Sequence, residues 1–85
     1  MQQNIYYIKY ALQFADMQIT ELVSSFNALV FNRGWVSMRG YHDQALLDEF
    51  LRRGINISCV YDGHIINLTH HVKYNMSENK LEITD

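Results

Sequence analysis

Proline is absent from this chain of 85 residues, and cysteine occurs only once, at Cys59. A single cysteine cannot form an internal disulfide, so the fold depends on packing alone, and a lone thiol fits a reducing compartment. No apolar run approaches the roughly 18 to 20 residues that a membrane-spanning helix needs, and the polar start of the chain does not resemble a signal peptide. The sequence therefore predicts a cytoplasmic protein without a membrane partner.

Charge of either sign is also scarce, and the formal net charge is −2. This balance excludes the long-range positive field that attracts nucleic acids and anionic lipids. Hydrophobic residues make up 48% of the chain and aromatic residues 13%, which is typical of chains that bury a core. No repeat or flexible linker divides the sequence. Residues 1–85 are therefore predicted to form a single domain.

Apolar residues alternate near the start of the chain. Every even position from Tyr6 to Phe14 is apolar, and this period of two, rich in aromatic residues, predicts a strand. The odd positions include Ile5, Tyr7 and Ala11. They make the second face more apolar than a solvated sheet face needs to be.

Helical spacing follows in residues 19–30, where apolar residues recur every third or fourth position. This pattern predicts a helix with Asp16 as N-cap and an end near Asn32. Residues 35–38 are partly β-branched or aromatic and predict a short strand or an extended link.

A second helix is predicted from about His42 to Arg53, with Asp43 near its start and Arg52 and Arg53 at its end. Gly54 follows directly, and a glycine in this position is typical of a Schellman stop.

Asp62-Gly63 lies between two β-rich runs and is typical of a type I′ turn, which needs positive φ at both residues. Such a turn pairs Tyr61 with His64 and places Val60 and Ile65 on the outer face of a hairpin. A further strand is predicted near the C-terminus. The fold class predicted from these patterns is α+β. In it, an N-terminal strand and a C-terminal three-stranded meander form an antiparallel sheet, and two helices pack on one of its faces.

Chemistry-bearing residues form no recognisable catalytic pattern. His70 and His71 are adjacent, so in a strand they point to opposite faces and cannot share a metal ion. Cys59 lies near His64 in the predicted hairpin, but no carboxylate orients the pair, and a cysteine among apolar residues is usually inert. Nucleotide-binding glycine motifs are missing. The sequence predicts no catalytic residue, no metal ligand, no cofactor and no enzymatic activity.

Four residues between the predicted helices interleave cations with aromatic rings: Arg33, Trp35, Arg39 and Tyr41. They precede a helix whose first amides could hold a phosphate or carboxylate. Binding of nucleic acid or of a small anion is therefore the alternative functional interpretation.

The preferred interpretation is a small non-enzymatic interaction or regulatory protein that self-associates, with an unidentified protein as a further partner. It follows from the apolar residues that the predicted outer sheet face would leave uncovered. A second copy offering the same patch would cover it and produce a homodimer. The residues predicted to form this interface are Ile5, Tyr7, Ala11, Val60 and Ile65.

Overall fold

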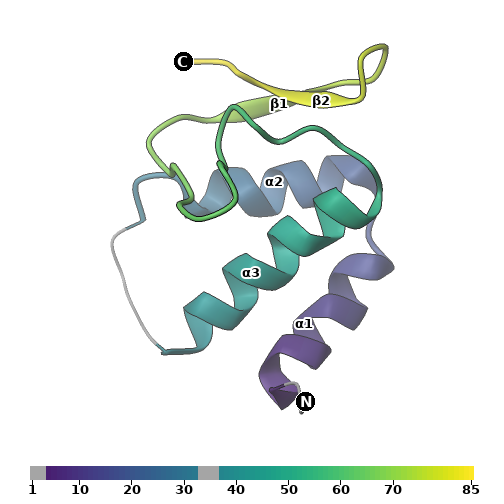
Figure 1. Cartoon of the computed structure of the whole chain (residues 1–85), viewed down its shortest axis with the longest axis vertical. Helices are drawn as coiled ribbons and strands as arrows, with labels where there is room; N and C mark the ends of the chain where they lie inside the picture. The colour runs from purple at the N-terminus through teal and green to yellow at the C-terminus, as the bar shows by residue number, and fades with distance from the viewer. Residues whose placement is uncertain (1–3, 33–36) are drawn as a thin grey trace.

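A computed structural model of the chain describes residues 4–32 and 37–85. Its elements, in chain order, are α1 (Ile5–Ala15), α2 (Ile19–Leu29), α3 (Ser37–Arg52), β1 (Val72–Asn75) and β2 (Lys80–Ile83). Figure 1 shows α3 at the centre of the molecule with α1 beside it, and α2 contacts both β1 and α3. No helix in this described part is long and apolar enough to cross a membrane.

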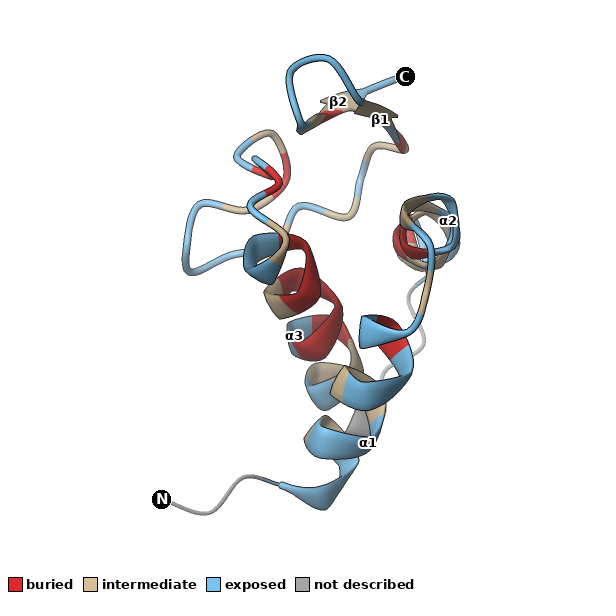
Figure 2. Ribbon diagram, turned by 90° about the vertical axis from the view of Figure 1, so that its right-hand side faces the viewer, coloured by how far each residue is buried: buried red, intermediate tan, exposed pale blue. Residues whose placement is uncertain are grey.

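The hydrophobic core lies where the helices meet the segment that follows α3. Figure 2 shows that buried positions are concentrated along α3, whereas α1 is largely exposed. A fully buried leucine or phenylalanine side chain contributes on the order of 1.5 to 3 kcal/mol through removal from water. The largest fully buried side chains are Phe14, Phe26, Phe50, Leu22, Leu46 and Leu47.

The N-terminal segment is helical, so the predicted strand from Tyr6 to Phe14 is wrong. Asn4 caps α1, because its Oδ1 accepts a hydrogen bond from the Tyr6 amide at 2.8 Å. Helical spacing then gathers on the α3 side four residues that a strand would divide between two faces. These residues are Tyr7, Tyr10, Ala11 and Phe14.

The other two helices occupy the stretches that were predicted to be helical, with different starting points. α2 is capped by Gln18 rather than Asp16, and the Gln18 amide donates to Glu21 Oε1 at 3.0 Å. α3 begins at Ser37, so the end of the predicted extended link is helical. Trp35 and Val36 lie outside the described residues.

Gly54 ends α3 as predicted. Its φ is +74°, which an L-residue adopts only with strain. The Gly54 amide donates to Leu51 O at 2.9 Å and the Ile55 amide to Phe50 O at 3.0 Å. These two bonds define a Schellman motif.

The predicted hairpin at Asp62-Gly63 is wrong. Gly63 has φ +99° but Asp62 does not have a positive φ, so the turn is not type I′. The side chain of Asp62 explains the difference, since its Oδ1 accepts from the amides of His64 and Ile65 at 2.8 Å each. The resulting Asx loop leaves a single bridge between Tyr61 and Ile66 in place of two strands.

Over the described ranges, 4–32 and 37–85, the sheet therefore has two strands, not the four that were predicted. β1 and β2 pair antiparallel, with Val72 opposite Ile83, and the predicted C-terminal strand is present in β2. The Asn27 carboxamide on α2 takes the place of a further strand. Its Nδ2 donates to Val72 O at 3.0 Å and its Oδ1 accepts from the Val72 amide at 2.9 Å. This pair of bonds attaches the sheet edge to α2.

Candidate functional site

The five residues predicted to form a dimer interface do not share a sheet face. Tyr7 and Ala11 pack against the core from α1, while Ile5 is exposed on the same helix. Val60 is only 3% exposed, so it belongs to the core rather than to an outer face. Ile65 is exposed in the Asx loop. The predicted surface depended on an N-terminal strand that is a helix.

Of the predicted anion-binding set, Arg39 and Tyr41 lie in the described part of the chain, and both have partners there. Arg33 and Trp35 lie outside the described residues. The guanidinium group of Arg39 donates to Asn32 O at 2.6 Å and to Asp43 Oδ2 at 3.3 Å. It also donates to Leu29 O at 3.4 Å, at the end of α2 where helix carbonyls lack intrahelical partners. Tyr41 stacks with Tyr6 across α1 and α3, with ring centroids 6.5 Å apart.

A second arginine, directly after α3, has a similar role at the end of α1. Arg53 donates to Phe14 O at 3.1 Å and to Met17 O at 2.6 Å. The buried carboxylate of Glu49 accepts from Arg53 and also from Arg52 at 3.0 Å. These hydrogen bonds, above all the one from Arg52, hold the pKa of Glu49 below its ordinary value. Glu49 thus orients Arg53, and the Arg53 hydrogen bonds join the end of α3 to the end of α1.

The single cysteine and the two adjacent histidines His70 and His71 have structural partners. Cys59 Sγ donates to Leu81 O at 3.2 Å, and burial raises the pKa of the thiol. His71 Nδ1 lies 2.8 Å from Asp85 Oδ2, and its neighbour His70 contacts Asp85 O at 2.9 Å. Within residues 4–32 and 37–85, no three histidine, cysteine or acidic side chains are placed to hold a metal ion.

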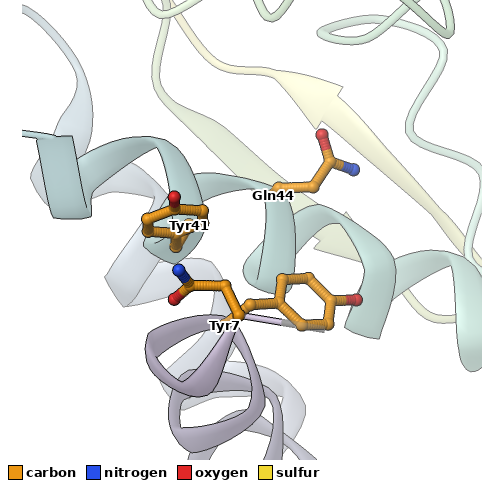
Figure 3. Close-up of a pocket in the computed structure, with 4 residues that line it drawn as sticks. Tyr7, Tyr41 and Gln44 are labelled. Atoms are coloured by element: carbon orange, nitrogen blue, oxygen red, sulfur yellow. The ribbon is translucent and has the colours of Figure 1, made fainter. Parts of the chain in front are cut away.

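A pocket of about 270 Å³ lies between the N-terminal end of α1 and α3. We call it the tyrosine pocket, and it is lined by Asn4, Tyr7, Tyr41 and Gln44. Figure 3 shows Tyr7 reaching it from α1, with Tyr41 and Gln44 reaching it from α3. Sequence analysis included Tyr7 and Tyr41 in two different predicted sites, and only the packing of α1 on α3 brings them together.

Asp48 anchors two side chains of the tyrosine pocket. Its Oδ2 accepts from the Tyr7 hydroxyl at 2.5 Å, and its Oδ1 accepts from Gln44 Nε2 at 2.9 Å. The Asp48 hydrogen bond, together with burial and the carboxylate charge, raises the pKa of Tyr7 to about 12. Tyr7 therefore remains a neutral phenol at physiological pH, and its ring is held in one orientation.

A second apolar surface runs along α1, on the side away from its packed face. Ile5, Ile8 and Leu12 are exposed and follow the i, i+3, i+7 spacing of one helix face. We call these three residues the α1 stripe; Ile5 is 73% exposed and Leu12 69%. Sequence analysis placed Ile8 and Leu12 on the even-numbered face of a predicted strand, although the helical spacing was equally visible in the sequence. Figure 2 shows α1 at the edge of the molecule, where a partner can reach it.

Comparison with known proteins adds no relative. No protein-family model matches the chain, no curated protein matches it, and no solved structure matches it.

Proposed function

We propose that this protein is a small non-enzymatic interaction domain that forms a homodimer through the α1 stripe. The observation that carries the proposal is the exposure of Ile5, Ile8 and Leu12 on a helix whose opposite side is already packed against α3. Contiguous exposed apolar surface is a common mark of a protein interaction site.

A second copy is the partner that fits this surface. α1 contains one charged residue, Lys9, and no acidic residue, so two α1 helices can approach without a large electrostatic cost. In an antiparallel pair with two-fold symmetry, Ile5 lies opposite the partner subunit's Leu12 and Ile8 lies near the axis. An isologous contact of this kind needs only a self-complementary patch.

The buried area supports a weak but specific dimer. Covering the α1 stripe on both copies removes roughly 600 Å² of apolar surface from water, which stabilises the dimer by about 15 kcal/mol before costs. Association itself costs about 4 to 15 kcal/mol. A specific interface needs about 1,000 Å² in total, so flanking side chains on both copies must contribute as well. The difference between gain and cost is at most about 11 kcal/mol, and the small area favours a weak dimer, so we expect a dissociation constant of about micromolar or higher.

The test is the molar mass in solution across a concentration series, measured by light scattering after size exclusion. Wild-type protein is expected to move from one to two chain masses as concentration rises, and Leu12→Lys is expected to remain monomeric. Ile65→Lys is the matched control, because Ile65 is 71% exposed but lies in the Asx loop. Circular dichroism shows whether each variant is folded. A wild-type monomer throughout, or equal effects of the two substitutions, would contradict the proposal.

The alternative of nucleic-acid or anion binding stays a prediction of the sequence, as does the cytoplasmic location. Of the four residues on which that alternative depends, Arg39 already donates hydrogen bonds to Asn32 O and to Asp43 within the chain.

A further inference from the structure

We infer that the tyrosine pocket binds an organic cation: an ammonium or guanidinium group on a short alkyl stem. Such a group occurs at the end of a lysine or arginine side chain and also in free alkylamines. The inference concerns a different surface from the α1 stripe and does not depend on dimer formation.

Aromatic rings provide the first reason. Tyr7 and Tyr41 contribute rings to the pocket from two different helices. The face of an aromatic ring carries negative electrostatic potential, so it attracts a cation within about 6 Å of the ring centroid. Both rings are held in place, Tyr7 by Asp48 and Tyr41 by stacking on Tyr6. A fixed ring loses little conformational entropy when a ligand binds.

Charge provides the second reason. Asp48 does not line the pocket, but its carboxylate accepts hydrogen bonds from two residues that do, Tyr7 and Gln44. None of the lining residues Asn4, Tyr7, Tyr41 and Gln44 is cationic. A carboxylate in contact with the lining and no cation within it favour a positively charged ligand over a neutral or anionic one. Gln44 Oε1 is an acceptor for an ammonium or guanidinium donor.

Volume provides the third reason. A pocket of about 270 Å³ lies just below the usual range of drug-sized sites. It is large enough for a four-carbon stem with one charged head group. The cation of one side chain fits this space.

The first experiment titrates the protein with n-butylammonium, followed by amide chemical shifts in NMR. The matched neutral probe is n-butanol, which has the same stem without the charge. Shifts are expected for residues around Tyr7, Tyr41 and Gln44 with n-butylammonium, at about millimolar concentration for so small a ligand. Equal binding of n-butanol, or no shift at these residues, overturns the inference.

Two variants test the mechanism of binding. Tyr41→Leu keeps an apolar side chain and removes the ring, and Asp48→Asn keeps the shape and removes the charge. Each is expected to weaken n-butylammonium binding about three- to tenfold. Tyr74→Leu and Asp16→Asn are the controls, because they make the same changes outside the pocket. Unchanged affinity in both pocket variants overturns the inference.

A final arm distinguishes the source of the cation and separates this inference from dimer formation. A short Gly/Ser peptide with one central lysine is compared with n-butylammonium. Tighter binding of the peptide indicates a protein-borne side chain, and equal or weaker binding indicates a free amine. The Leu12→Lys variant is expected to retain n-butylammonium binding even where it abolishes the dimer. Loss of binding in this folded variant would overturn the assignment of the pocket as an independent site.

Discussion

Replacing Glu49 by glutamine tests the ion pairs that orient Arg53, the residue that joins the end of α3 to α1. The Glu49 side chain is only 4% exposed and accepts hydrogen bonds from Arg52 and Arg53. Arg53 in turn binds Phe14 O and Met17 O at the end of α1. Glutamine preserves the size of the side chain but replaces one carboxylate oxygen with an NH2 group. That group is a donor facing the arginine donors, so the network loses an acceptor as well as a charge.

The expected loss follows from the strength of charge-assisted hydrogen bonds. Each contributes about 1.5 to 3 kcal/mol to stability. The bonds to Arg52 are discounted because this side chain is largely exposed. The pair with Arg53 therefore dominates, and we expect Glu49→Gln to lower the free energy of unfolding by about 2 kcal/mol. For a domain of this size, that corresponds to a fall in Tm of about 10 °C.

Thermal unfolding followed by circular dichroism measures this change, with Glu78→Gln as the matched control. Glu78 forms an ion pair with Lys80 in which both side chains are exposed. The Tm of the Glu78→Gln variant is therefore expected to stay within about 2 °C of wild type. A fall of less than about 3 °C for Glu49→Gln, or equal falls in both variants, would refute the stabilising role of this network.

The same pair of proteins gives a prediction for pH. Hydrogen bonds from Arg52 and Arg53 hold the pKa of Glu49 below its ordinary value of 4.5. A lowered folded-state pKa means that the stabilisation is complete above the unfolded-state pKa and is lost as pH falls through the folded-state pKa. The Tm difference between wild type and Glu49→Gln is therefore expected to be constant from neutral pH to about pH 5 and to shrink at lower pH. A constant difference down to pH 3 would contradict the assignment.

Two further predictions concern the sheet. Asn27→Leu removes both hydrogen bonds to the Val72 backbone, so unfolding should become easier by about 1 to 2 kcal/mol; faster hydrogen exchange at Val72 in the variant is the check, and unchanged exchange would argue against the contact. Cys59 should react slowly with iodoacetamide in the native protein, because burial raises the pKa of its thiol. Reaction as fast as in the denatured chain would show that the thiol is accessible.

Local signals in the sequence were sufficient to predict α2 and the second half and end of α3. The apolar spacing of residues 19–30 fits a helix and not a strand, and Gly54 supplies the positive φ that ends a helix. These features depend on residues a few positions apart. The start of α3 was predicted too late, because residues 37–41 contain no apolar periodicity that would distinguish helix from link.

The segment around Asp62-Gly63 shows why a turn motif can mislead. The dipeptide favours a type I′ hairpin, but the Asp62 carboxylate competes for the same amides and forms an Asx loop. Upstream, the amides of Val60 and Tyr61 both donate to Ile57 O. This turn buries Val60 and ends any strand before the dipeptide. Which alternative forms depends on how Ile57 and Val60 pack in the core, and the local sequence does not contain that information.

The tyrosine pocket was beyond sequence analysis for a related reason. Tyr7 and Asp48 are separated by 41 positions, and no motif connects them. Their contact exists only because α1 is a helix lying along α3. Once Tyr7 was assigned to a strand, its hydroxyl had no partner in the predicted fold. A correct assignment of α1 is therefore the step on which both candidate surfaces depend.

The error over α1 has the same origin as the surface proposed for self-association. A helix that packs on one side shows apolar residues at every third or fourth position and polar residues elsewhere. α1 adds Ile8 and Leu12 on the side away from α3, and these two residues complete the apolar alternation that predicts a strand. If both positions were lysine, the sequence of this segment would predict an amphipathic helix. Disagreement between local pattern and fold is most frequent at functional sites. Ile8 and Leu12 are exposed, and the dimer proposed above would account for their apolar character.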